Sequence, residues 1–343
     1  MLYNKRIESN HKSKTVVLIS NLGTPNQPTE QDVRVYLREF LSDKDVIRLP
    51  RIFWLPLLHL IILRSRPKKS AELYKKVWTE WGSPLLYNTF LQAGLLRQKL
   101  QDNFTIDVAM RYGKPSIESK IMEYIRLGFT NILFLPMFPQ YSTTTTKSIA
   151  NQIARITKKN NLSLEDKNIY MIKDFHDHDG YINSSVSHIK SFQCVHGKPD
   201  KLLLSFHGIP KSYVGEDEPY QSQCFKTANL IAKKLNLSSN DYEIVFQSRF
   251  GKSEWIQPYL AERLEKLPLE NNKNIQVYCP GFPSDCLETI EEIGEESHDL
   301  FMESGGETYK FIPCLNGNKD FIDFLEMLIK DHEKEKIDFR DLL

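Results

Sequence analysis

One histidine, His207, follows a short apolar run and stands just before residues that end strands. The run at residues 202–206 is of the kind that lies inside a parallel sheet, and Gly208 and Pro210 then end it. His207 is therefore expected where the backbone leaves the sheet, at the edge where open α/β sheets bind ligands. An imidazole there can accept a proton near neutral pH or bind a metal. The plainer alternative is a histidine that caps a loop through hydrogen bonds.

A second feature with chemical capacity is a row of glutamates that follows another apolar run, at residues 275–279. Glu288, Glu292 and Glu296 recur every four residues, which predicts one acidic face along a helix. Like charges at that spacing repel, so water, protons or a cation must offset them. Asp285, three residues before Glu288, has the spacing of a helix capping box. The row therefore predicts a helix that starts at a ligand-binding edge.

Three further residues of this stretch predict its local structure. Gly294 is a poor helix residue, so we expect it to mark a bulge or distortion. Glu291 and Glu295 fall outside the main row and are expected on a solvated face.

Composition places the chain among ordinary globular proteins. Its 343 residues can hold one large or two ordinary domains, and 41% of them are hydrophobic and 26% charged. The net charge of +1 argues against a nucleic-acid partner, because such partners usually demand a basic face. Residues 1–14 are polar, so no signal peptide is expected. Five scattered cysteines without a CxxC pair fit a reducing compartment and argue against a disulfide framework.

The alternation of apolar β-rich runs with amphipathic stretches predicts a parallel α/β sheet architecture. The expected strands form two sets of four: 15–20, 105–110, 131–135 and 168–172, then 201–206, 242–247, 275–279 and 309–312. Two sets suggest two α/β halves, which we place at residues 1–174 and 175–343, and the last helix is expected to pack back on the first half. No GxGxxG or Walker-type motif is present, so a nucleotide cofactor is unsupported.

An apolar segment at residues 52–63, IFWLPLLHLIIL, is flanked by arginines and lysines within residues 48–69. It is too short to span a bilayer, which needs about 20 apolar residues, and Pro56 is expected to interrupt any long helix. One interpretation is a buried helix. The other is a lip that contacts an anionic membrane surface and admits an apolar substrate.

Several motifs occur in an order and spacing that resemble the ferrochelatase family, whose members insert ferrous iron into a porphyrin in the last step of haem synthesis. The motifs cover nearly the whole chain and are NLGTP at 21–25, RVYLREFLSD at 34–43, GSPL at 82–85, MRYG at 110–113, PQYS at 139–142, SFHG at 205–208, QSRFG at 247–251 and SDCLET at 284–289. The resemblance implies two similar Rossmann-like halves with a porphyrin cleft between them. It also places the lip at the mouth of the porphyrin pocket.

The resemblance assigns roles to individual residues. It implies that His207 and Glu288 face each other across the cleft as the catalytic and metal-binding pair, with His207 acting as either base or metal ligand. Glu292 and Glu296 would extend a proton or metal path toward solvent. The porphyrin-contacting residues that it implies are Leu22, Tyr112 and Trp255 for the ring, and Arg64, Arg111 and Ser248 for the propionates.

Other consequences of the resemblance concern metals. Some family members hold a two-iron sulfur cluster through cysteines near the C-terminus, whereas this chain has no cysteine after Cys314, so no cluster and no tightly bound cofactor are predicted. Cys286 stands where other members have histidine, so a third metal-binding histidine is not expected there. The sequence His176-Asp177-His178-Asp179 has metal-site composition, but alternating histidine and aspartate in a turn is usually solvated.

The leading interpretation is a protoporphyrin ferrochelatase that takes ferrous iron and protoporphyrin IX. Its alternatives are a coproporphyrin ferrochelatase and a non-catalytic porphyrin or haem carrier. A distant chelatase that inserts cobalt or nickel would share the fold without this ordered set of motifs. The predicted location is the cytoplasm, and peripheral contact with the inner membrane face stays open.

Overall fold

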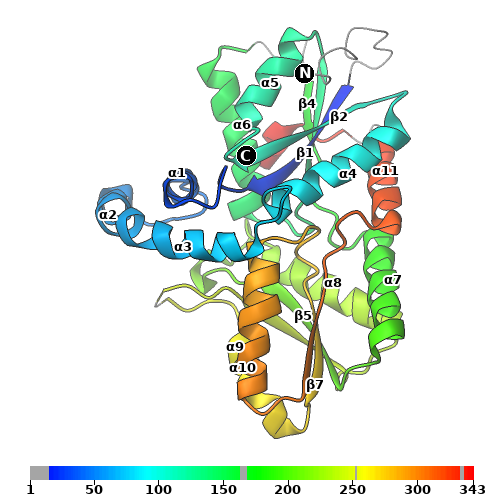
Figure 1. Cartoon of the computed structure of the whole chain (residues 1–343). Coiled ribbons are helices and arrows are strands. Elements are labelled where there is room, and N and C mark those ends of the chain that lie inside the picture. The colour runs from blue at the N-terminus through cyan, green and yellow to red at the C-terminus, as the bar shows by residue number, and fades with distance from the viewer. Residues whose placement is uncertain (1–14, 163–167, 252, 333–335) are drawn as a thin grey trace.

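The computed structural model describes residues 15–162, 168–251, 253–332 and 336–343. The expectation about a signal peptide concerns residues 1–14, which lie outside the described residues. Two four-stranded parallel sheets form the centre of the molecule, one from each half of the chain (Figure 1). Their strand orders are β2-β1-β3-β4 and β6-β5-β7-β8. The predicted α/β class and the two sets of four strands are therefore confirmed.

Each predicted strand occurs within a few residues of its expected bounds. The strands are β1 Thr15–Gly23, β2 Thr105–Tyr112, β3 Asn131–Pro136, β4 Asn168–Met171, β5 Lys201–His207, β6 Tyr242–Gln247, β7 Asn274–Tyr278 and β8 Thr308–Ile312. All neighbouring pairs run parallel. The central strand of each sheet is covered on both faces, which is why its sequence is a continuous apolar run and not an alternating one.

Helices cover both sheets. In the first half they are α1 Glu30–Leu41, α2 Arg51–Leu57, α3 Leu63–Val77, α4 Pro84–Leu100, α5 Ile117–Arg126 and α6 Ser148–Lys159. In the second half they are α7 Asp179–His196, α8 Tyr220–Leu235, α9 Leu260–Lys266, α10 Ser297–Glu303 and α11 Lys319–His332. Three segments are π-helical: η1 Leu58–Ile62, η2 Thr143–Lys147 and η5 Glu288–Glu296. Three are short 3₁₀ turns: η3 Lys211–Tyr213, η4 Pro268–Glu270 and η6 Phe339–Leu342.

One hydrophobic cluster runs through both halves. It joins side chains of β1 and β3 to side chains of β5 and of α7, α8 and α11. The last helix, α11, packs on α7 and also on α4 of the first half, as expected, and Figure 1 shows α11 and α7 along one side of the molecule. The boundary placed at residues 174 and 175 falls between β4 and α7 and stays a prediction.

The segment that carries the apolar run projects from the body of the first half in Figure 1. Ile52, Phe53, Leu60 and Ile61 are each more than half exposed, so the buried-helix interpretation is wrong for them. Trp54, Leu58 and Leu63 point inward and are buried. The segment is therefore an amphipathic helix with an unusually apolar outer face.

Pro56 does not interrupt this helix, contrary to the sequence-based expectation. The chain continues from α2 through the π-helical turn η1 into α3 without a break. Proline removes one backbone donor, but the helical hydrogen bonds resume directly after it, since Leu58 N–H bonds to the carbonyl oxygen of Trp54. Within the part of the chain that the structure describes, no helix combines the length and apolarity needed to cross a bilayer.

Candidate active site

His207 is the last residue of β5, as predicted, and pairs in register with Gln247 at the end of β6. Its Nδ1 lies 2.6 Å from the carbonyl oxygen of Gly208. A carbonyl can only accept, so this contact assigns the ring proton to Nδ1 and leaves the lone pair on Nε2. No partner of Nε2 is found among the described residues. The half-buried ring can therefore present one basic nitrogen for a proton or a metal.

Trp255 borders this histidine, with the two ring centroids 6.4 Å apart. Gly208 allows the approach, because a Cβ there would lie 3.1 Å from the indole Cε3 and 2.9 Å from the carbonyl oxygen of Gln247. The predicted Trp255 thus lies beside His207 and supplies a flat apolar surface at the strand end.

The acidic helix is π-helical over nine residues, Glu288–Glu296, before it continues as α10. The predicted distortion around Gly294 is therefore confirmed, and it extends over the whole acidic segment. A π-helix closes i→i+5 hydrogen bonds and is rare outside functional sites. Its wider turn brings residues four apart closer to one line than an α-helix does, which aligns the row of glutamates.

The predicted capping box does not form with Glu288. Instead the backbone N–H of Cys286 donates to Thr289 Oγ1 at 2.9 Å, and that hydroxyl lies 3.1 Å from Asp285 Oδ1. Asp285 also accepts from the backbone of Cys314 at 3.1 Å. Because Thr289 takes the capping role, the Glu288 carboxylate is not needed there.

Glu292 is held by Ser248 at the end of β6. Its Oε1 accepts the backbone N–H of Ser248 at 2.7 Å, and its Oε2 accepts the Ser248 hydroxyl. Ser248 adopts a φ of +64°, a left-handed conformation that few non-glycine residues take and that often marks a functional site. The predicted propionate contact of Ser248 thus competes with an existing carboxylate partner.

Burial raises the pKa of Glu292, and the charge of Glu288 adds to the rise, whereas Ser248 and His207 act to lower it. His207 and Glu288 are therefore both electrostatic neighbours of Glu292. Gln247 links them physically as well. Its carbonyl oxygen accepts from Gly208 N at 2.8 Å, and its side-chain Nε2 lies 3.4 Å from the carbonyl oxygen of Glu288.

The remaining glutamates of the acidic helix differ in their exposure to solvent. Glu296 is exposed at the end of the row. Glu291, which was expected in solvent, is 8% exposed and lies 3.3 Å from Lys76 of α3, so that expectation is wrong. Glu295 is exposed as predicted and lies 3.2 Å from the same Lys76.

The predicted Arg111 and Tyr112 lie at the end of β2 in a buried polar cluster. Arg111 pairs with Asp43 and donates through Nε to Ser148 Oγ at 2.7 Å, and Tyr112 donates to Asp43 Oδ2 at 2.8 Å. Burial acts to raise the pKa of Asp43, but Arg111 and the neighbouring donors outweigh it and hold the pKa below its usual value. Both predicted contact residues are thus already engaged within the protein.

The other predicted porphyrin contacts lie on the lip side of the molecule. Leu22 packs against a buried cluster that includes Tyr36, Tyr74 and Trp54, and Leu287 joins the same cluster. Arg64 on α3 is exposed.

Arg66 is a residue that sequence reasoning missed. It is half-buried, its guanidinium lies 4.5 Å from the centroid of the Phe250 ring, and burial lowers its pKa. No ion pair to it occurs among the described residues. A desolvated guanidinium without a carboxylate can receive an anionic group.

Two tyrosines beside Glu288 were also missed. Tyr36 and Tyr74 are buried, and their pKa values are raised by burial and by the Glu288 charge. They lie on α1 and α3, so only the tertiary fold brings them to this carboxylate. No local signal in the sequence could have found them.

The His176 segment forms a compact group. Asp174, His176 and Asp177 offer ligand atoms within 4.8 Å of one another, but His176 Nδ1 contacts Asp174 at 2.7 Å and Lys226 pairs with Asp177 at 2.5 Å. Among the described residues this is the only group of three such ligands, and it contains no cysteine. Neither His207 nor Glu288 belongs to it.

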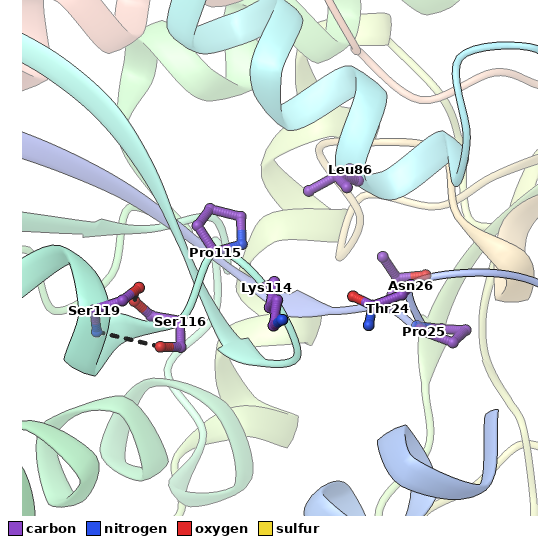
Figure 2. A pocket seen from close by; sticks show the side chains of 8 residues that line it. All are labelled: Thr24, Pro25, Asn26, Leu86, Lys114, Pro115, Ser116 and Ser119. Atoms are coloured by element: carbon purple, nitrogen blue, oxygen red, sulfur yellow. Dashed lines mark hydrogen bonds between the residues drawn. The ribbon is translucent and has the colours of Figure 1, made fainter. Parts of the chain in front are cut away.

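A separate cavity of about 440 Å³ lies where β1 and β2 end and α5 begins. Figure 2 shows its lining side chains, which are Thr24, Pro25, Asn26, Leu86, Lys114, Pro115, Ser116 and Ser119. The catalytic candidates do not line it.

Comparison with known proteins agrees with the resemblance that the motifs predict. A family model for ferrochelatase matches residues 14–333, nearly the whole chain. The chain belongs to the ferrochelatase family. Its reaction is the insertion of ferrous iron into a porphyrin, which makes it a lyase of haem biosynthesis.

Individual relatives support this membership. The ferrochelatase of Idiomarina loihiensis is 45% identical over 93% of this chain and 88% of its own length. That of Marinobacter nauticus is 45% identical over 94% and 88%, and that of Alcanivorax borkumensis is 43% identical over 96% of each chain.

Solved structures support the fold alone. The structure of SirB from Bacillus subtilis with Fe³⁺ superposes with a TM-score of 0.55 at 11% identity, over 95% of this chain and 99% of SirB. The sirohydrochlorin chelatase SirB in complex with cobalt gives a TM-score of 0.52, also at 11% identity. These superpositions show that the chain shares its overall fold with SirB.

The raised pKa of Glu292 predicts a pH-dependent effect of Glu292→Gln on stability. The folded protein holds this proton more tightly than the unfolded chain, in which glutamate titrates near about 4.3. The contribution of the Glu292 carboxyl to the free energy of unfolding is therefore greatest below that pH. It is lost as pH rises through the pKa of this carboxyl in the folded protein. As pH rises above the ordinary titration range of a glutamate, the melting temperature of the wild type should therefore fall relative to that of Glu292→Gln.

The exposed Glu296→Gln is the matched control for this measurement. Its melting temperature should follow that of the wild type across the same pH range. A Glu292→Gln difference that is independent of pH would contradict the assignment of a raised pKa to this carboxyl.

Proposed function

We propose that the enzyme inserts ferrous iron into protoporphyrin IX, with His207 and Glu288 acting at the centre of the ring. The observation that carries the proposal is the contact of His207 Nδ1 with the Gly208 carbonyl. This contact leaves the lone pair of Nε2 available, on a ring that lies beside Trp255. A group that must accept a pyrrolic proton or hold iron needs such a nitrogen.

Insertion requires that two pyrrolic N–H bonds break as the iron exchanges water for four ring nitrogens. Nε2 of His207 accepts one proton and Glu288 accepts the other, and the N–H electron pairs become the new bonds to iron. Glu292, whose pKa is raised by burial, then relays protons toward the exposed Glu296 and water. The reaction consumes one porphyrin and one Fe²⁺ and releases two protons.

The ring is held by apolar surfaces and the propionates by cations. Leu22 and Trp255, which are partly exposed, are the proposed packing residues, and they rank ahead of Tyr112, which is fully buried. Among the cations, Arg64 is exposed and Arg66 is half-buried without a carboxylate partner, so both can accept a propionate directly.

The two remaining propionate candidates have competing partners. A propionate bound to Arg111 would compete with Asp43, and one bound to Ser248 would compete with Glu292. We therefore rank Arg66 and Arg64 ahead of Arg111 and Ser248 in this role.

The lip favours protoporphyrin over coproporphyrin. Protoporphyrin carries two propionates and two vinyl groups, whereas coproporphyrin carries four propionates. The exposed apolar side chains of Ile52, Phe53, Leu60 and Ile61 suit the less charged ring. The same face, with its flanking cations, suits peripheral contact with an anionic inner membrane surface from the cytoplasm. No nucleic-acid partner, resident cofactor or iron–sulfur cluster is part of the proposal.

His207→Ala should lower the rate of iron insertion by about 100-fold or more, the usual contribution of a positioned proton-transfer group. Porphyrin affinity should change little, because apolar walls hold the ring. Haem absorbance reports turnover, and quenching of porphyrin fluorescence reports binding. The exposed His196→Ala is the control and should behave as the wild type. Near-normal turnover in His207→Ala would contradict the proposal that His207 accepts a pyrrolic proton or holds iron.

A lip variant, Phe53→Ser with Ile61→Ser, should raise KM for protoporphyrin several-fold and leave kcat nearly unchanged. Both residues are exposed, whereas Leu58 is buried and would unfold the helix if changed. Sedimentation with anionic liposomes should also fall, and wild-type binding should weaken as salt screens the flanking cations.

The control for the lip is Val195→Ser with Leu269→Ser, which removes equally exposed apolar groups elsewhere. In the wild type, kcat/KM for protoporphyrin should exceed that for coproporphyrin III. If the lip variant keeps wild-type KM and wild-type liposome binding, the lip has no role in substrate capture.

A further inference from the structure

Lys76 lies near the end of α3, Leu63–Val77, the helix that continues the lip and is therefore named the lip helix. It joins this helix to the acidic π-helix η5, Glu288–Glu296. Its Nζ lies 3.3 Å from Glu291 Oε1 and 3.2 Å from Glu295 Oε2, so one ammonium bridges two carboxylates on the same helix. Lys76 belongs to the first half of the chain, and the two glutamates belong to the second. In Figure 1 the end of α3 lies above the helix that continues into α10, and α3 and η5 are in contact.

The burial of Glu291 decides how much this bridge matters. A fully exposed ion pair contributes little, because water and salt screen it. The side chain of Glu291 is only 11% exposed, whereas those of Lys76 and Glu295 are about half exposed. Removing the sole cation partner of a buried carboxylate leaves a charge that the protein does not compensate. Among the described residues, Lys76 is the only cation paired with Glu291.

The bridge acts on a segment that needs external support. Five glutamates lie within Glu288–Glu296, where like charges repel, and a π-helix is rare and usually limited to a single turn. Ser248 holds this segment from the second half through Glu292. Lys76 holds it from the first half.

The start of the same helix is also in contact with α3. Tyr74, two residues before Lys76, belongs to the buried cluster against which Leu287 packs, and its pKa is raised by burial and by the charge of Glu288. The lip helix therefore contacts the acidic helix at two levels, through an apolar contact near Glu288 and an ionic contact one turn later.

We infer that Lys76 is a positioning residue that fastens the π-helix to the lip helix and thereby keeps Glu288 in place for iron insertion. The inference rests on the proposed function, because it assumes that Glu288 acts on the substrate. Lys76 itself does not touch the reacting atoms. It transmits the position of α3 to the helix that carries the catalytic carboxylate.

The test compares Lys76→Met with Lys75→Met. Lys75 is the neighbouring lysine on the same helix and pairs within that helix with Glu72, so its change removes a charge without touching η5. Lys76→Met should lower kcat five- to tenfold, roughly one unit of log rate, with KM for protoporphyrin changed less than about twofold. Lys75→Met should match the wild type. Lys76→Arg should restore kcat, since it keeps the charge.

A second readout does not depend on turnover. Backbone hydrogen exchange of peptides covering 288–296 should speed up in Lys76→Met and not in Lys75→Met, because local opening becomes easier. The double variant Lys76→Met with Glu291→Gln should be no slower than Lys76→Met alone, since both changes remove one bridge.

The outcomes separate the two proposals. If Glu288→Gln keeps wild-type turnover, the proposed function of Glu288 fails whatever Lys76 does. If Glu288→Gln is inactive and Lys76→Met keeps wild-type kcat and wild-type exchange at 288–296, the positioning role of Lys76 is overturned. Loss of kcat in Lys76→Arg equal to that in Lys76→Met would also overturn it, because the charge would then not be the cause.

Discussion

Five carboxylates within nine consecutive residues create the constraint on which the rest of the site depends. Their repulsion is offset in different ways along the helix. Lys76 pairs with Glu291 and Glu295, and Ser248 donates two hydrogen bonds to Glu292. The π-helical turn aligns the row that begins at Glu288 and spreads the remaining groups around the axis. Elements of both halves of the chain therefore contact the acidic helix and offset its charges.

One strand end of the second half presents the histidine. Gln247 pairs with His207 across β5 and β6, and its side chain reaches the carbonyl of Glu288. Ser248, the next residue, takes a left-handed conformation that turns its donors toward Glu292. His207 and the acidic row are thus held by two adjacent residues, Gln247 and Ser248, at one sheet edge. Ferrochelatase chemistry needs both, because ring protons must leave as iron enters.

Much of the fold was predictable because each half repeats one pattern of apolar strands and amphipathic helices. His207 was predictable for the same reason, since the strand and the residues that end it are local signals. The partners of buried charged side chains could not be predicted from the sequence. Glu291 was expected in solvent, but a lysine 215 residues away in sequence brings it into the interior. Pro56 was expected to break a helix, but the helix continues through it into η1 and α3. Such tertiary contacts leave no local trace in sequence.

The central claim is that the backbone holds His207 with its proton on Nδ1, so that Nε2 acts on the porphyrin. Nitrogen NMR of the metal-free enzyme labelled with ¹⁵N-histidine measures this directly, with His207→Gln used to assign the signal. The account predicts that, in the neutral ring, Nδ1 of His207 shows the chemical shift of a protonated nitrogen and Nε2 that of an unprotonated one. A proton found on Nε2 of His207 in the neutral ring would contradict the account.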